Sequence, residues 1–192
     1  MQINKSRCDW GSQDELMIAY HDNEWGVPVH DDNKHFEYLV LDAFQAGLSW
    51  ATILKKRENF RKAFDNFDFR KIAKYDKKKI SGLLIDQGII RNKLKIESTI
   101  TNAKCFLEVI KEFGSFDKYI WSFVDNKIIK NKWTTIKQLP VTTKESDAMS
   151  KALKKRGFKF VGSTICYSYM QAAGLVNDHM MYCFRYDSTI TR

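Results

Sequence analysis

The sequence predicts a mostly helical protein that folds as a single domain over residues 1–192. Apolar residues recur at three- and four-residue intervals along most of the chain, which is the spacing of one helix face. The 192 residues include only 9 Gly and 2 Pro, which argues against a turn-rich β fold. No internal repeat, low-complexity tract or clear linker divides the chain, so its helices form either one lobe or two lobes that share a core.

Three helices are expected in the first third of the chain. The segment "SQDELMIAYHDNEW" has two N-cap candidates, Ser12 and Asp14. A second helix follows Pro28, and its apolar stripe consists of Phe36, Leu39, Val40, Ala43 and Phe44. Gly47 is expected to end this helix, and Ser49 to cap a third one, "WATILKKRENFRKAF".

Helical patterns continue through the rest of the chain with one interruption. They cover residues 69–75, 77–85 and 92–113, and a short aromatic segment, "FDKYIWSFV", follows. The section "NKIIKNKWTTIKQLPVTT" is the part that looks like strand or loop. Thr143 or Ser146 then starts the helix "ESDAMSKALKKRG", and Ser163 is expected to cap "TICYSYMQAAG".

The charge and the hydropathy limit the classes of partner. A formal net charge of +9 favours a polyanion, either nucleic acid or an acidic membrane surface, although many basic proteins bind neither. No apolar run reaches 18 residues, so no membrane span is expected. The start "MQINKSRCDW" lacks the apolar segment of a signal peptide, which makes a cytoplasmic location the expectation.

Two cysteines and two histidines near the chain ends are candidate metal ligands. Cys8 and His21 lie near the N-terminus, and His179 and Cys183 are four residues apart, one turn along a helical face. Such a set suits a tetrahedral zinc ion, and a closed four-ligand site is structural. The alternative is that the thiols are small buried hydrophobes and the imidazoles ordinary hydrogen-bonding groups.

The other cysteines and histidines have no such spacing. Cys105 and Cys166 lie on apolar helical faces and are expected in the core. His30 and His35 flank a loop and are expected to be solvated. Disulfides are not expected in a cytosolic chain of this size.

A basic turn with two glycines, "KKRGFKFVGST", joins the last two long helical patterns. Gly157 and Gly162 free the backbone to turn, and the amides of the helix that Ser163 begins can receive a phosphate. The neighbouring cations are Lys154, Lys155, Arg156 and Lys159. The segment is therefore either a sequence-independent phosphate clamp or a solvated basic turn.

Four aromatic residues gather near the candidate metal ligands and the first glycine break. They are Trp10, Tyr20, Trp25 and Trp50. Their rings can sandwich a flat base, especially a cationic one, or they can form a small aromatic core. Asp42 lies off the apolar stripe of its helix, and by itself it is best interpreted as an exposed acid, because unpaired acids are rarely buried.

Long ordered blocks of the chain resemble the DNA-3-methyladenine glycosylase I (Tag) family. The blocks are "CDW", "IAYHDNEWGVP", "QAGLSWATILKKRENFRKAF" and "KALKKRGFKFVGSTICYSYMQAAGLVNDH", and the similarity runs from about Arg7 to Cys183. The resemblance implies an all-α helix-hairpin-helix DNA glycosylase fold. It also implies a structural zinc, bound by Cys8, His21, His179 and Cys183, that joins the two chain ends.

The resemblance further implies an N-glycosyl hydrolase of DNA repair. Such an enzyme flips 3-methyladenine out of alkylated double-stranded DNA and hydrolyses its glycosidic bond, which leaves an abasic site and the free base without cutting the strand. A monomer in the cytoplasm is expected, with no membrane partner. A non-catalytic binder of damaged or abasic DNA remains the alternative, whereas a zinc deaminase is disfavoured because the paired H-x-E and P-C-x-x-C motif is absent.

The resemblance also assigns roles to residues. It implies that Trp10, Tyr20, Trp25 and Trp50 form the base pocket, that Asp42 is the catalytic carboxylate that reads the base, and that Leu48 is a wedge at the opened DNA. The residues that grip DNA are then Lys155, Arg156, Gly157, Lys159, Gly162 and Ser163.

Two positions in the expected pocket depart from the family pattern. The family has Glu at the position of Asp42, so the carboxylate here is withdrawn by one carbon–carbon bond, about 1.5 Å. The family often has Tyr at the position of Met17. Both changes are expected to enlarge or reshape the pocket.

Overall fold

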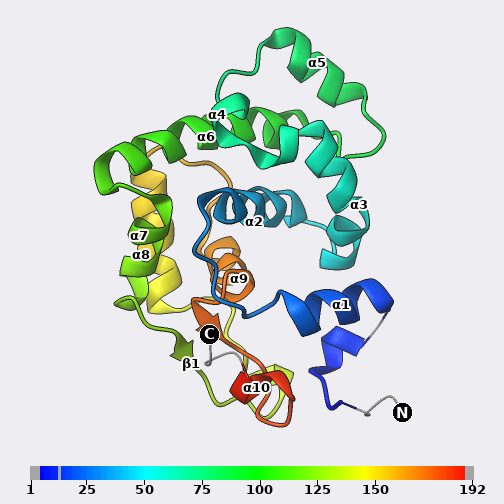
Figure 1. Cartoon of the computed structure of the whole chain (residues 1–192), viewed down its shortest axis with the longest axis vertical. Coiled ribbons are helices and arrows are strands. Elements are labelled where there is room, and N and C mark those ends of the chain that lie inside the picture. The colour runs from blue at the N-terminus through cyan, green and yellow to red at the C-terminus, as the bar shows by residue number, and fades with distance from the viewer. Residues whose placement is uncertain (1–4, 13, 189–192) are drawn as a thin grey trace.

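The protein is described by a computed structural model that covers residues 5–12 and 14–188, and it is mostly helical, as the sequence predicts (Figure 1). The first residues of the N-terminal stretch on which the cytoplasmic expectation rests, 1–4, lie outside the described part. The α-helices are α1 Glu15–Asn23, α2 Asp32–Gln45, α3 Trp50–Ala63, α4 Phe69–Ile72, α5 Lys77–Ile85, α6 Lys93–Phe113, α7 Phe116–Trp121, α8 Lys144–Lys155, α9 Ser163–Ala172 and α10 Arg185–Ser188. The short elements are η1 Asp9–Ser12, η2 Asp65–Phe67, η3 Ser122–Val124, η4 Ile136–Gln138, β1 Ile129–Lys130 and β2 Val176–Asn177.

Helix α2 runs through the middle of the molecule, and other helices enclose it. It packs against α3, α6, α7 and α9, and Figure 1 shows it between the α4–α6 layer and α9. Ten consecutive residues, 35–44, are buried, so burial extends far beyond the predicted apolar stripe. The expectation from periodicity that Asp42 is exposed is therefore wrong: its exposed fraction is 2%.

His35 is also buried, in contrast to the expectation that it is solvated. Its Nδ1 forms a hydrogen bond of 2.6 Å with the Tyr169 hydroxyl, and its Nε2 lies 3.2 Å from the Asp117 carboxylate. These partners come from α9 and α7, which pack on the same helix. His30, by contrast, is exposed as predicted.

Side-chain caps fix most of the predicted helix starts. Asp14, not Ser12, is the N-cap of α1, and Ser49 caps α3 by accepting a hydrogen bond from the Thr52 amide. Thr143 caps α8 as one of the two predicted candidates. The prediction for α9 is wrong by one residue, because Gly162 is its N-cap and Ser163 its first residue.

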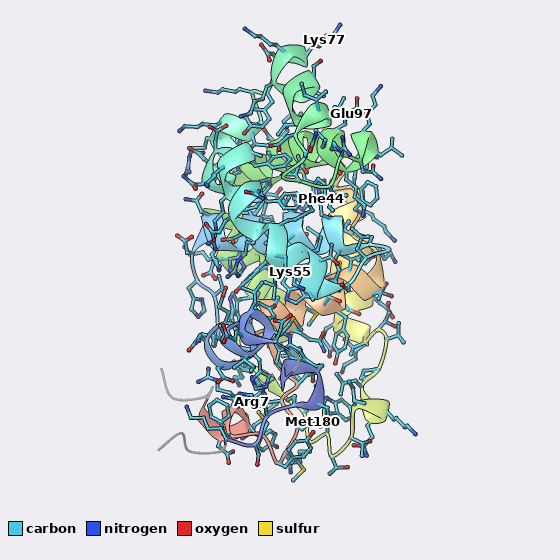
Figure 2. All side chains as sticks on the ribbon, turned by 90° about the vertical axis from the view of Figure 1, so that its right-hand side faces the viewer. Arg7, Phe44, Lys55, Lys77, Glu97 and Met180 are labelled. Atoms are coloured by element: carbon cyan, nitrogen blue, oxygen red, sulfur yellow. The ribbon has the colours of Figure 1, made fainter. Side chains whose placement is uncertain are left out.

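Described segments from near the two termini meet at one end of the elongated molecule. Figure 2 shows Arg7 and Met180 there, with Lys77 at the opposite end. The predicted strand or loop section contains β1, which pairs in parallel with β2 in the register Ile129↔Val176. Nearby, the Phe184 amide donates to the Ser6 carbonyl at 2.9 Å.

The predicted core is one continuous hydrophobic cluster. Phe36, Phe44 and Phe106 are fully buried in it, and the Phe36 and Phe106 rings lie 5.2 Å apart. Cys166 is buried as expected, whereas Cys105 is only half-buried beside the cluster. Among the described helices, none is long and apolar enough to cross a membrane.

Gly174 lies in close backbone contact with the Val27–Pro28 segment. Its φ is +70°, and a Cβ there would lie 2.4 Å from the Val27 carbonyl carbon. We expect Gly174→Ala to lower the free energy of unfolding by about 2 kcal/mol or more, because both the backbone conformation and the contact are incompatible with a side chain. The measurement is thermal unfolding at fixed pH.

Gly82→Ala is the matched control for this prediction. Gly82 lies inside α5, and a Cβ there meets nothing within 4 Å. We expect a gain of about 0.5–1 kcal/mol, because alanine favours a helix interior over glycine. Equal stability changes in the two variants would contradict the account of the Val27 contact.

Candidate active site

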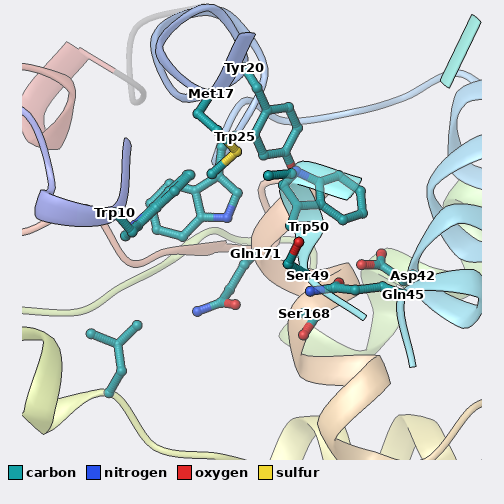
Figure 3. Close-up of a pocket in the computed structure, with 12 residues that line it drawn as sticks. Trp10, Met17, Tyr20, Trp25, Asp42, Gln45, Ser49, Trp50, Ser168 and Gln171 are labelled. Atoms are coloured by element: carbon teal, nitrogen blue, oxygen red, sulfur yellow. The ribbon is translucent and has the colours of Figure 1, made fainter. Parts of the chain in front are cut away.

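A cavity of about 370 Å³ lies between the N-terminal segment, the α2–α3 turn and α9. The structure brings together all six residues that the sequence and the resemblance single out for a base pocket (Figure 3). The complete lining is Trp10, Met17, Tyr20, Trp25, Asp42, Gln45, Ser49, Trp50, Ala51, Leu139, Ser168 and Gln171.

One part of the cavity is aromatic. The ring centroids of Tyr20 and Trp50 lie 5.2 Å apart, and those of Trp10 and Trp25 lie 4.7 Å apart at an interplanar angle of 76°. Tyr20 and Trp25 are buried, and the other two rings are half-buried. The negative faces of such rings attract flat and cationic ligands.

Asp42 places a buried carboxyl group at the wall of the cavity. Its Oδ2 atom is buried and has no hydrogen-bond partner within the described residues, and the same holds for Nε1 of Trp50. Burial raises the pKa of Asp42 well above its ordinary value, because the charged form loses its hydration. An unpaired buried carboxyl group is costly in the folded protein, which marks it as a candidate ligand-binding group.

Several polar lining residues were not predicted from the sequence to face a pocket. Gln45 and Ser49 belong to the same "QAGLS" segment as the turn, and Figure 3 shows Gln45 beside Asp42. Ser168 and Gln171 are three residues apart on α9, a spacing that could have identified a common face. Leu139 comes from an irregular segment and had no sequence signal.

The α2–α3 turn forms one edge of this region. Gly47 has φ +81°, so the predicted chain reversal requires its left-handed backbone. Leu48 follows with an exposed fraction of 40%, and its amide donates to the Gln45 carbonyl at 2.6 Å. The structure thus exposes the residue expected to act as a wedge.

The basic hairpin between α8 and α9 is held against α6. The Lys159 amide donates to Asn102 Oδ1 at 2.7 Å, and the Asn102 amide group donates back to the Lys159 carbonyl at 3.0 Å. Gly157 has φ +92°, while Gly162 and Ser163 begin α9. The side chains of Lys155 and Lys159 are exposed.

Arg156 is committed to contacts within the protein. Its guanidinium donates two hydrogen bonds to Glu112, at 2.6 and 2.9 Å, and lies over the rings of Phe113 and Tyr119. A bidentate pair of this kind fixes the side chain. Arg156 thus fixes the end of α8 to α6 through Glu112, whereas the side chains of Lys155 and Lys159 face solvent.

The four candidate metal ligands form one buried cluster. The ligand atoms of Cys8, His21, His179 and Cys183 all lie within 4.8 Å of one another. Sγ–N distances are 3.7 Å from Cys8 to His179, 3.6 Å from Cys183 to His179 and 3.5 Å from Cys183 to His21. In a tetrahedral zinc site, the sulfur and nitrogen ligand atoms lie about 3.6 Å from one another. The distances in the cluster therefore fit this ion.

Hydrogen bonds orient both imidazoles of the cluster. His21 Nδ1 donates to Asp22 at 2.8 Å, and Arg7 in turn donates to the same carboxylate. His179 Nε2 donates to the Trp25 carbonyl at 3.1 Å. With these bonds, His21 Nε2 and His179 Nδ1 face the thiols, as metal-binding histidines require; the Cys8 amide also donates to His21 Nε2 at 3.4 Å.

The cluster also supports the aromatic part of the cavity. The His179 ring lies 4.6 Å from the Trp25 ring, and the His21 ring lies 5.3 Å from the Trp10 ring. Gly11 fits closely on His21, because a Cβ at this glycine would lie 2.5 Å from the imidazole. The cluster and two cavity walls are therefore parts of one packed unit.

Comparison with known proteins identifies the family. Residues 10–186 match the family model for methyladenine glycosylase. The chain is 53% identical to DNA-3-methyladenine glycosylase 1 of Escherichia coli (strain K12), over 94% of this chain and 96% of the relative. It is 47% identical to DNA-3-methyladenine glycosylase of Haemophilus influenzae, over 93% and 96%.

Solved structures give the same result. A crystal structure of 3-methyladenine DNA glycosylase I (TAG) matches with a TM-score of 0.89 and 53% identity, covering 93% of this chain and 98% of that one. TAG from Staphylococcus aureus, solved to explain its recognition of 3-methyladenine, matches with a TM-score of 0.91, 33% identity and 97% coverage of both chains. The chain is therefore an enzyme and belongs to the methyladenine glycosylase family.

Burial of the Asp42 carboxyl group is expected to make the stability of the protein depend on pH. Because its pKa is raised in the folded state, the stability that this group contributes is present below its unfolded-state pKa of about 3.9 and is lost as pH rises through the folded-state pKa. We expect Asp42→Asn, which cannot ionise, to unfold at a higher temperature than the parent at pH 8.

The size of this change in unfolding temperature depends on how far the pKa of Asp42 is raised. Each unit of pKa shift corresponds to about 1.4 kcal/mol, and each kcal/mol to about 2–4 °C in a domain of this size. The difference between the proteins is expected to vanish at about pH 3, where both side chains are neutral. Asp125→Asn, at an exposed loop position, should show no such gain; a variant at Asp42 that melts no higher than the parent at pH 8 contradicts the prediction.

Proposed function

We propose that the protein releases 3-methyladenine from alkylated double-stranded DNA by hydrolysing its N-glycosidic bond. The observation that carries this proposal is the unpaired, buried Asp42 carboxyl group in a cavity walled by aromatic rings. Relatives named 3-methyladenine glycosylases support it, and one solved relative, a variant of TAG, is in complex with 3-methyladenine. The products are an abasic site and the free base.

The base enters the cavity by rotating out of the duplex. 3-Methyladenine in DNA is cationic, so its glycosidic bond is weak and the leaving base needs no added proton. The faces of Trp10, Tyr20 and Trp50 attract the cation. Asp42 Oδ2, which lacks a protein partner, accepts a hydrogen bond from the adenine edge. A cation nearby favours ionisation of this carboxyl group and opposes the effect of burial on its pKa.

Selectivity follows from the same charges. Neutral adenine gains less from the aromatic faces and does not compensate for burial of a carboxylate. Asp42 and Met17 stand where the family usually has larger side chains, so we expect a wider pocket on this side. The C1′–N bond then breaks with its electron pair on the departing base, which becomes neutral, while water bonds to C1′ of the deoxyribose and releases a proton to solvent. No lysine is among the described residues that line the cavity, which agrees with hydrolysis without strand cleavage.

The DNA backbone is proposed to contact the basic hairpin and the α2–α3 turn. Lys155 and Lys159 are exposed for phosphate contacts, and Gly157, Gly162 and Ser163 shape the hairpin and the start of α9. Leu48 fills the space that the flipped base leaves. We propose that Arg156, held by Glu112, mainly positions the hairpin.

We also propose that the chain works as a monomer and as one domain, with a helix-hairpin-helix at α8–α9 and the pocket between two helical lobes.

We propose that the Cys8–His21–His179–Cys183 cluster binds a structural zinc ion. The fit of the donor distances to a tetrahedral site and the orienting hydrogen bonds support this assignment. When bound, the ion links the two chain ends and has no open position for chemistry. The four residues hold it, and Trp10 and Trp25 pack on their imidazoles.

The proposed activity is tested by release of base from methylated DNA. We expect the purified protein to release 3-methyladenine, detected by chromatography, and Asp42→Asn to reduce the rate by about 10²–10³-fold because the stabilising anion is lost. Asp125→Asn is the matched control and should keep the parental rate.

Two results would count against this function. Folded protein that releases no more base than a no-enzyme reaction contradicts catalysis. If it then binds abasic DNA tightly, the result favours the alternative of a non-catalytic damage binder. If Asp42→Asn keeps the parental rate, the proposed role of Asp42 is wrong.

The zinc assignment predicts one ion per chain by elemental analysis. Cys183→Ser is expected to lower both the zinc content and the unfolding temperature, because a four-ligand structural site contributes folding energy. Cys105→Ser removes a half-buried thiol outside the cluster and should retain the ion. Folded parental protein with far less than one zinc per chain contradicts the assignment.

A further inference from the structure

We infer that Lys95 is a positioning residue: its buried ammonium group holds the α2–α3 turn so that Asp42 and Trp50 face the same cavity. The inference rests on the proposed function only for its activity measurement. Lys95 lies on α6, some fifty positions along the chain from the turn, and it does not line the cavity.

The contacts of Lys95 are short and are made to the backbone. Its Nζ donates to the Phe44 carbonyl at 2.8 Å and to the Ala46 carbonyl at 2.6 Å. The residue has an exposed fraction of 6%, so water does not compete freely for these bonds. A cation that donates to neutral carbonyls in a buried place forms strong, directional hydrogen bonds.

The C-terminal end of α2 needs such a donor. The last carbonyls of a helix have no partners within the helix and carry its negative pole. α2 has no basic residue in its own last turn, and at Ala46 the backbone leaves the helical region, with φ −48° and ψ 115°. The Leu48 amide donates to the Gln45 carbonyl. Lys95 adds two contacts from outside the helix, to the Phe44 and Ala46 carbonyls.

The position of Lys95 is unfavourable for its own helix. It lies in the first turn of α6, where the helix pole is positive and acidic residues, of which this turn has none, are preferred. No carboxylate pairs with its ammonium group in the described part of the chain, and burial lowers its pKa. Lys93, in the same turn, is exposed and lies 3.9 Å from Glu97. Lys95 thus destabilises the start of α6 and forms no ion pair among the described residues that would offset this. We infer that its contribution lies at the α2–α3 turn.

The turn connects the two sides of the cavity. Asp42 and Gln45 belong to the last turn of α2, and Ser49 and Trp50 begin α3; all four line the cavity. Since only residues 46–49 separate the two helices, a change in the turn alters the position of Trp50 relative to Asp42. A shift of about 1 Å in such a site can reduce a reaction rate 100-fold.

Lys95→Met tests the inference, because it keeps the length of the side chain and removes its charge and donors. We expect hydrogen exchange of the amides in residues 46–49 to be about tenfold faster or more, since the turn loses the bonds to its Phe44 and Ala46 carbonyls. This measurement uses the free protein and needs no substrate. We also expect the rate of base release at saturating DNA to fall by about 10- to 100-fold.

Val109→Ala is the matched control for lost stability. Val109 is fully buried farther along α6. Its apolar side chain cannot form hydrogen bonds with the turn. Its variant is expected to melt at a lower temperature, yet to keep the exchange rates of residues 46–49 and the rate of base release. If Lys95→Met does not fold, Lys95→Gln, which keeps one donor group, is compared in the same way.

The outcomes separate the inference from the proposed function. If the lysine variant matches Val109→Ala in both measurements, Lys95 only contributes to stability and the inference is wrong. If exchange in residues 46–49 rises while the release rate stays at the parental value, the turn is anchored but does not position the site, which also overturns the inference. If the parental protein releases no base, the proposed function fails, and a parental exchange pattern in the variant still refutes the anchor.

Discussion

The enclosure of α2 on all sides is the constraint on which the candidate site depends. A helix with one solvated face would place Asp42 in water, where a carboxylate is inexpensive and has an ordinary pKa. Because α3, α6, α7 and α9 all pack on α2, the same residue lies in the interior, at the wall of a cavity. Its carboxyl group lacks a described partner there. The fold thus holds a polar group in a state that a bound ligand can relieve.

The two sides of the cavity have different supports. The Asp42 side depends on α2 and on the turn that Lys95 anchors from α6. The aromatic side depends on the Cys–His cluster, whose His179 donates to the Trp25 carbonyl. The cluster is formed from both ends of the chain, so the pocket is complete only when the whole chain is folded. We therefore propose that the cluster supports the base site and takes no part in the chemistry.

Local sequence signals predicted local structure well. Caps such as Ser49 and Thr143 were identified because a side-chain oxygen and a nearby amide are close in sequence. Burial of Asp42 and His35 was not predicted from periodicity, because an apolar stripe describes one helix face and gives no information on what covers the others. For Asp42, the family resemblance supplied what the pattern lacked. The buried role of Lys95 had no signal, since its partners are backbone carbonyls distant in sequence.

The central claim is that hydrogen bonding from a bound base relieves the burial of the Asp42 carboxyl group. The most direct test is to measure the pKa of the Asp42 carboxyl group by carbon-13 NMR titration, with and without bound 3-methyladenine, and with Asp42→Asn to assign the signal. We expect a pKa above the ordinary value of about 3.9 in the free protein and a lower pKa in the complex. A pKa that is ordinary in the free protein, or that does not fall on binding, would contradict it.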